Sequence, residues 1–201
     1  GKAAAQLRTA QEKYRESAEK SEKLRSRYNM MNSAFLDAFN LLGGNISVEG
    51  LKENSLQGDK IYKEYFELLK KGAPTLDIRN CPDLAPILMT LAAALNGATL
   101  TGTKRLKIKE SDRGLVMKQE LEKLGADIEV YDDEIIINKS ELTKPKEKLS
   151  GHNDHRVVMS LAILLSKYGG EIEGAEAVKK SYPDFFIKAE ALGLEVKAYD
   201  N

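Results

Sequence analysis

From about residue 29 onward, apolar residues recur at helical spacing in three stretches, and each stretch is followed by glycine and a short strand-like run. The glycine lies where the end of a helix calls for a left-handed residue. A further glycine (Gly50, Gly102 or Gly174) ends each run, and a second helix follows a polar loop. The chain therefore repeats a helix–strand–loop–helix unit three times. The opening helices are predicted at 33–42, 84–95 and 154–167, the strands at 45–49, 98–101 and 171–173, and the closing helices near 58–70, 111–124 and 183–192.

Two alternating runs, 127–131 and 134–138, are separated by Asp132-Asp133 and predict a hairpin attached to the second unit. The first unit has only the run 75–79 in the corresponding place. Such repeats predict an α/β fold in which equivalent elements pack about a common axis. The corresponding helix starts then point the same way, and their free N–H groups attract anions.

Residues 1–28 differ from the rest, because they are rich in strong helix formers and contain no proline and no glycine beyond Gly1. They predict one long helix that runs into the first apolar segment, so we divide the chain into a helical extension, 1–28, of fused or engineered origin, and a main domain, 29–201. The helix carries a heptad seam whose middle is too polar to promise a stable dimer, although self-association through it stays open. The seam residues are Ala3, Leu7, Ala10, Tyr14, Ser17, Ser21, Leu24, Tyr28, Met31 and Phe35.

Composition narrows the class of protein. The chain has 201 residues, 31 Lys+Arg and 31 Asp+Glu, and this zero net charge argues against a general nucleic-acid or membrane-surface binder. The basic stretch 104–109 lacks the aromatic neighbours that RNA binding favours. The single cysteine, Cys81, excludes a disulfide framework and a multi-thiolate metal site. No run reaches the length of a membrane span, and the first residues lack the apolar centre of a signal peptide, so we expect a soluble, cytoplasmic protein.

Charged residues gather just before, or within the first turn of, several predicted helices. Acids at such places serve as helix caps, which by itself explains much of their presence. Arg113, Arg156 and Lys180 are harder to explain, because a helix start disfavours positive charge. They indicate either an anion-binding enzyme or solvated charges that adjacent acids neutralise. The four clusters are 81–83, 109–113, 153–156 and 180–184, and their acids include Asp83, Asp112, Asp154 and Asp184.

Two carboxylates beside these cations, Glu110 and Asp83, fit the general acid and base of an enzyme. The structural alternatives are that Glu110 extends a charged loop and that Asp83 caps the helix 84–95. His155 is either a proton shuttle or a hydrogen-bonding group at a helix start. His152, Asp154 and His155 lack a fourth ligand, and such a group is common by chance, so we expect no metal.

At these clusters the chain resembles the enolpyruvyl transferase family, in particular its members that act on shikimate 3-phosphate. The matching stretches are 54–59, 81–85, 107–113, 153–156 and 180–186, and their order and separations also match. The resemblance covers residues 29–201 and implies two domains, each built from three βαβαββ units with helices packed inside, an inside-out α/β barrel. It also implies a cleft between the domains that closes on substrate, no metal and no organic cofactor.

The implied reaction transfers the enolpyruvyl group of phosphoenolpyruvate to the 5-hydroxyl of shikimate 3-phosphate, a step in aromatic amino acid biosynthesis. Position by position, Asp83 resembles the proton acceptor that contacts shikimate 3-phosphate, and Glu110 the carboxylate that handles protons at the methylene carbon. Among the substrate-binding positions, Lys109 resembles a shikimate 3-phosphate contact and His155 an active-site histidine of lesser role. The cations that grip phosphoenolpyruvate correspond to Arg113, Arg156 and Lys180.

The chain also departs from the family pattern. It lacks the family's opening Lys-Ser…Arg segment and the domain that carries a Ser-Ser-Gln run and another arginine, so we expect a half-site that is inactive without its missing partner domain. Two alternatives stay open. One is the sister enzyme that acts on a UDP-sugar, and the other is a non-catalytic interaction module that works through the N-terminal helix.

Overall fold

The computed structural model describes residues 33–44, 57–191 and 195–198. Its centre is one complete βαβαββ unit with a four-stranded sheet in the order β1-β2-β4-β3. β1 runs parallel to β2, and β4 is antiparallel to both β2 and β3. Parallel neighbours need a crossover, which the first helix of the unit provides. The unit comprises β1 (Thr75–Asp77), α3 (Ala85–Ala94), β2 (Ala98–Thr101), α4 (Arg113–Glu122), β3 (Asp127–Val130) and β4 (Glu134–Asn138).

A second, shorter unit repeats the same order of elements. β5 (Leu149–Ser150) and β6 (Ile172–Glu173) form a parallel pair, and α5 (His155–Tyr168) connects them. The 3₁₀ helix η3 (Ala175–Lys180) and α6 (Phe185–Ala191) follow. Nearer the N-terminus, residues 33–41 are helical and α2 (Gln57–Lys71) follows them. The α/β class and the helices predicted at 33–42, 58–70, 84–95, 111–124, 154–167 and 183–192 are thereby confirmed.

Some predictions need correction, and others lie outside the described residues. Residues 75–79 do not belong to the first predicted repeat, because β1 pairs with β2 and opens the complete unit that ends at β4. A short apolar run predicts a strand but not its partner, which explains the error. The segments predicted as loops after β2 and β6 contain the 3₁₀ helices η2 (Lys104–Ile108) and η3. The predicted helix 1–28 and strand 45–49 lie outside the described residues.

The hairpin prediction holds. β3 and β4 pair in register, with Ile128 opposite Ile137 and Val130 opposite Ile135. The turn between them is closed by the Tyr131 N–H, which donates to the Glu134 carbonyl at 2.8 Å. Ile128, Ile135 and Ile137 are buried, so alternate positions face the core as the pattern predicts.

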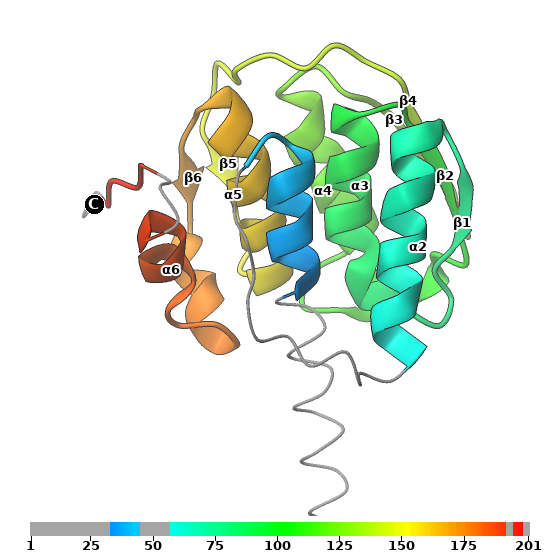
Figure 1. Cartoon of the computed structure of the whole chain (residues 1–201), viewed down its shortest axis with the longest axis horizontal. Helices are drawn as coiled ribbons and strands as arrows, with labels where there is room; N and C mark the ends of the chain where they lie inside the picture. Colours follow the sequence, from blue (N-terminus) through cyan, green and yellow to red (C-terminus); the bar gives the residue numbers. More distant parts are fainter. Residues whose placement is uncertain (1–32, 45–56, 192–194, 199–201) are drawn as a thin grey trace, which may run out of the picture.

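Helices fill the interior of the fold. α3 is buried on all sides from Ala85 to Ala93, and it packs against α2, α4 and α5. Figure 1 shows α3 among the other helices, with β1–β4 along one side and β5–β6 beyond α5. Burying each large side chain of α3, such as Leu88 or Leu91, contributes about 1.5–3 kcal/mol to folding. An apolar helix at the centre and sheets at the periphery agree with the inside-out arrangement that the family resemblance implies.

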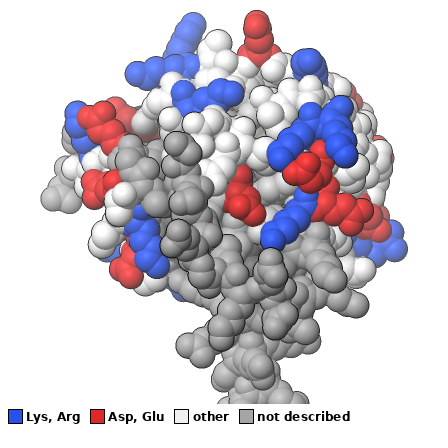
Figure 2. Space-filling view, in the orientation of Figure 1, with Lys and Arg blue, Asp and Glu red and all other residues white. Residues whose placement is uncertain are grey.

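The surface is mixed in charge. Figure 2 shows lysine, arginine, aspartate and glutamate side chains interspersed over the described part of one face, which suits a net charge of zero. Within the described ranges, no helix combines the length and the apolar character that crossing a membrane requires.

Candidate active site

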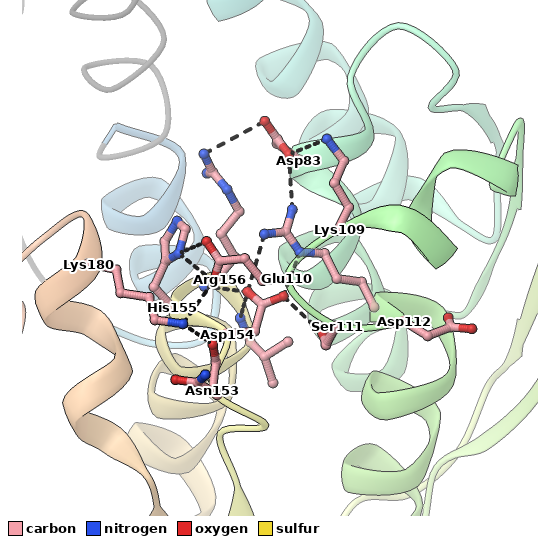
Figure 3. Close-up of polar contacts among 12 residues, drawn as sticks. Asp83, Lys109, Glu110, Ser111, Asp112, Asn153, Asp154, His155, Arg156 and Lys180 are labelled. Carbon is pink, nitrogen blue, oxygen red and sulfur yellow. Dashed lines mark hydrogen bonds and ion pairs between the residues drawn. The ribbon is translucent and has the colours of Figure 1, made fainter.

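The starts of three helices bring the predicted site residues together. Asp83 lies in the 3₁₀ helix η1 (Pro82–Leu84), directly before α3, and Arg113 is the first residue of α4. His155 and Arg156 open α5, and Lys180 ends η3. α3, α4 and α5 pack against one another, so these starts meet at one end of the helix layer (Figure 3). All seven predicted site residues, including Lys109 and Glu110 from the segment before α4, lie there in two groups of ion pairs, one around Asp83 and one around Glu110. Asp154 joins the two groups into one network, because it binds Arg113 and its carboxylate lies within 4.8 Å of the ligand atoms of Glu110 and His155.

Asp154 is the hub of this network. Its side chain is fully buried and caps α5, because Oδ1 accepts from the Arg156 N–H at 3.0 Å. Oδ2 accepts from Arg113 Nε and from Ser111 Oγ, both at 2.9 Å. Burial alone raises the pKa of Asp154, but the bonds from Arg113 and Ser111 outweigh it, and the pKa is lowered. The sequence predicts a cap here, and what it misses is that the cap also orients Arg113.

Arg113 joins two carboxylates from different helices. It is 2% exposed, and its Nη1 donates to Asp83 Oδ1 at 2.9 Å while Nη2 donates to Asp154 Oδ1 at 3.2 Å. A buried cation at a helix start is stable only when such partners neutralise it. Arg113 therefore does lie at a helix start, where positive charge is unfavourable, and its ion pairs with Asp83 and Asp154 offset that cost.

Asp83 lies among three cations. Its carboxylate is 3.2 Å from Lys109 Nζ, 2.9 Å from Arg113 Nη1 and 3.7 Å from Arg156 Nη2. Burial raises its pKa, but these three charges outweigh burial and lower the pKa to about 2. Asp83 is thus ionised at neutral pH, inside a cluster in which positive charge is in excess.

The capping alternative for Asp83 is wrong. The caps of η1 and α3 are Cys81 and Leu84, and neither helix start has a side-chain cap bond. Asp112, by contrast, caps α4 by accepting from the Leu115 N–H at 3.2 Å. It points away from the cluster in Figure 3. In the sequence, Asp83 and Asp112 are equally good candidates for helix caps. In the structure, only Asp112 of these two caps a helix.

Glu110 and His155 form a second pair within the site. His155 Nδ1 lies 2.9 Å from Glu110 Oε1 and 3.1 Å from Oε2. The pKa of His155 is lowered by burial and by Arg156, although Glu110 opposes the shift. A neutral His155 can donate from Nδ1 to the carboxylate. This pair therefore can hold or pass a proton beside the cation cluster.

Lys180 reaches the same pair from η3. Its Nζ is 3.8 Å from Glu110 Oε2 and donates to the Asn153 carbonyl at 2.5 Å. Its predicted place at a helix start is wrong, because it ends η3 and precedes α6 by five residues. A C-terminal helix end favours positive charge, so the argument from unfavourable placement holds for Arg113 and Arg156 alone.

A metal does not fit this arrangement well. Glu110, Asp154 and His155 offer ligand atoms within 4.8 Å of one another. However, the Asp154 oxygens already accept from Arg113, Ser111 and backbone N–H groups, and Lys180 lies beside Glu110. A divalent cation would meet these positive charges. His152, weighed as a ligand from the sequence, instead lies 2.7 Å from Glu120.

Cys81 lies next to the site but is a poor nucleophile. Burial, with Asp77 and Asp83 nearby, raises the pKa of its thiol to about 11. The thiolate is the reactive form of cysteine, and almost none is present at neutral pH. Nucleophilic catalysis by Cys81, which the sequence already disfavours, receives no support.

The chain is similar to proteins of one known family. The family model described as "EPSP synthase (3-phosphoshikimate 1-carboxyvinyltransferase)" matches residues 30–189. A 3-phosphoshikimate 1-carboxyvinyltransferase of Clostridium acetobutylicum is 37% identical over 184 residues, which cover 82% of this chain and 42% of the relative. One of Methanococcus vannielii is 35% identical over 181 residues, covering 78% of this chain and 41% of the relative.

A solved structure agrees as well. The EPSP synthase of Acinetobacter baumannii matches with a TM-score of 0.53 and 31% identity, covering 60% of this chain and 29% of that chain. The chain thus spans about two fifths of the length of the curated relatives it matches. With the family match extending over most of its residues and the relatives agreeing, the chain belongs to the EPSP synthase family.

Proposed function

We propose that this chain supplies one half of an active site that transfers the enolpyruvyl group of phosphoenolpyruvate to the 5-hydroxyl of shikimate 3-phosphate. The observation that carries the proposal is the ionised Asp83 within reach of Lys109, Arg113 and Arg156. Both substrates are multiply charged anions, and a partly buried group of cations suits their phosphates and carboxylates. The names of the relatives favour shikimate 3-phosphate over a UDP-sugar as the acceptor.

In this proposal the two carboxylates divide the proton transfers. Asp83 accepts the proton of the 5-hydroxyl as its oxygen attacks the central carbon of phosphoenolpyruvate. Glu110, held by His155, delivers a proton to the methylene carbon and removes one when phosphate leaves and the double bond re-forms. The protons balance, because Glu110 regains in elimination the proton that it gave in addition, and the hydroxyl proton taken by Asp83 leaves with the departing phosphate. Addition and elimination at one carbon require such a pair of groups that act as acid and base in turn.

The cations bind and orient the substrates. Arg113, Arg156 and Lys180 would hold phosphoenolpyruvate and stabilise charge that develops as phosphate leaves, and Lys109 would contact shikimate 3-phosphate. Asp154 keeps Arg113 in place. No metal or organic cofactor has a role in this scheme.

The chain needs a partner to act. It spans 42% of the Clostridium acetobutylicum relative. We propose residues 29–201 as one domain that closes against the family's other domain, with residues 1–28 as an extension. We place the reaction in the cytoplasm, where its phosphorylated substrates are retained.

Complementation tests the proposal. The chain is mixed with the part of the Clostridium acetobutylicum protein that it does not match. Release of phosphate from phosphoenolpyruvate is then measured in the presence of shikimate 3-phosphate. We expect no turnover from either piece alone, turnover from the mixture, and a loss of at least about a hundredfold in Arg113→Ala or Asp83→Ala. Arg79→Ala is the matched control, because Arg79 is exposed and pairs only with the exposed Asp77 among the ion pairs of the described residues. Turnover that survives both site substitutions, or that prefers a UDP-sugar, would overturn the assignment.

A further inference from the structure

The turn that precedes α5 has a strained backbone. The Gly151 carbonyl accepts from the Asp154 N–H at 2.9 Å, and the two residues between them, His152 and Asn153, have φ values of 48° and 53°. Turns with two left-handed central residues strongly favour glycine or asparagine, and histidine in this conformation costs free energy. The strained turn leads directly into the site residues Asp154, His155 and Arg156.

Gly151, at the start of the turn, has little room to change its position. A Cβ on Gly151 would lie 2.5 Å from Val158 Cγ2 and 2.9 Å from the Gly174 carbonyl. The Gly151 N–H also donates to the Glu173 carbonyl at 2.8 Å. Freedom to relax therefore exists mainly at His152 and Asn153, and the Asn153 carbonyl is tied to Lys180.

Glu120 holds His152, the other residue of the turn whose backbone has room to relax. It is 2% exposed, and its Oε1 lies 2.7 Å from His152 Nε2 while Oε2 accepts from the Ser150 N–H at 2.9 Å. Lys123 Nζ, 2.9 Å away, completes the shell of this carboxylate. Burial raises the pKa of Glu120, but the bonds from His152, Ser150 and Lys123 outweigh it and lower the pKa. An ionised, buried carboxylate thus receives the His152 ring.

The same helix contacts the turn at a second point. Glu120 follows Arg113 by seven residues on α4, which places the two side chains on one face about two turns apart. Arg113 binds Asp154 at the end of the turn, and Glu120 binds His152 within it. Arg113, Glu120, Asp154 and His155 are the acidic, basic and histidine side chains that are buried in the part of the chain that the structure describes. They form one arrangement around this turn.

We propose that Glu120 and His152 are a positioning pair, which holds the turn in its left-handed form and thereby sets Asp154 against Arg113 in the phosphoenolpyruvate site. The effect of this pair on phosphoenolpyruvate binding rests on the proposed function, but its effect on the turn and on Arg113 does not. Without the bond to Glu120, the backbone at His152 relaxes toward negative φ. Asp154 then shifts, and Arg113 Nε loses its buried acceptor.

The test uses the Arg113 side chain as its reporter. In the full chain, the exchange of the Arg113 Nε–H with water is followed by NMR, and phosphoenolpyruvate binding is titrated in parallel. In His152→Ala we expect the Nε–H to exchange at least about tenfold faster and the phosphoenolpyruvate Kd to rise about tenfold, as for the loss of one bond to a charged group. His152→Gln keeps a donor for Glu120 and should restore both values.

Matched variants separate positioning from general stability. Glu120→Gln carries the same readout and keeps the side-chain shape, so it serves if His152→Ala does not fold. Glu122→Gln removes an exposed partner of Lys118 on the same helix and should leave Arg113 unchanged. Unchanged Arg113 exchange in both His152→Ala and Glu120→Gln, or failure of His152→Gln to restore it, would overturn the proposal. If the complementation mixture described above gives no turnover yet Arg113 exchange responds as expected, positioning stands and the proposed function fails.

Discussion

At the scale of single residues, the cation-rich cluster makes Asp83 a source of both stability and reactivity. Three cations around one carboxylate repel one another, and Asp83 is the negative charge that all three share. An anionic substrate would add negative charge to the same cluster. We therefore expect Asp83 to matter most for stability when no substrate is bound.

Asp83→Asn tests this balance. The pKa of Asp83 is lowered from 3.8 to about 2, so its stabilising effect is complete above pH 4 and is lost as pH falls toward 2. The shift corresponds to about 2 kcal/mol. We expect Asp83→Asn to lower the free energy of unfolding by about that amount at pH 7, with the difference shrinking below pH 4.

Urea unfolding at several pH values measures the effect. Asp132→Asn is the control, because Asp132 pairs with Lys104 and Lys107 at the surface, where such pairs contribute little. An equal loss of stability in both variants, or a difference for Asp83→Asn that does not change between pH 5 and 2.5, would contradict the interpretation.

At the scale of elements, Gly97 at the end of α3 is required both by the local helix end and by a contact with β4. Gly97 has a φ of 84°, and its N–H donates to the Ala92 carbonyl at 2.8 Å. The sequence predicts this left-handed glycine. The structure adds that a Cβ at this position would lie 2.4 Å from the Ile137 carbonyl on β4. The glycine therefore both ends the helix and lets the hairpin strand approach.

Gly97→Ala should destabilise the fold by more than about 2 kcal/mol, because it combines left-handed strain with a clash against backbone. Gly72→Ala is the matched control, since no atom lies within 4 Å of its Cβ position and its φ is not positive. There we expect a change of less than about 1 kcal/mol. Thermal unfolding of both variants measures the contrast, and similar melting temperatures would show that β4 moves aside at little cost.

At the scale of the whole molecule, the open question is whether the chain associates with itself. The heptad seam of residues 1–28, which lies outside the described residues, has serines at its centre. The described part has a mixed surface charge in Figure 2, and few of its large apolar side chains are exposed: Leu68, Ile108, Leu115, Tyr131 and Ile187. Neither feature favours a tight dimer.

We expect sedimentation of the full chain to give a mass near 22.3 kDa at low micromolar concentration, with little change on dilution. The comparison is a chain that lacks residues 1–28, which should behave alike. A mass that rises with concentration in the full chain alone would favour the interaction-module alternative, because only the seam would then explain association.

Much of this molecule is readable from local patterns. Helices, the hairpin and the glycines at helix ends depend on contacts between neighbours along the chain, and the sequence predicts those of the described residues to within a few positions. The clusters 81–83, 109–113 and 153–156 were also recognisable, because charged residues at helix starts form an unusual pattern. The 3₁₀ helices were missed, since a helix of one or two turns has too few residues to show a period.

Local patterns along the chain are enough to predict the α/β class and the places of the described helices, and to pick out the candidate site residues. The packing of the fold sets which groups meet: Arg113 with Asp154, 41 residues apart, and His155 with Glu110, 45 residues apart. It also decided that β1 pairs with β2, that Asp83 faces cations instead of capping α3, and that Glu120 holds His152. The physical reason is that periodicity and capping act within a few residues, whereas these partners are chosen by how α3, α4 and α5 pack.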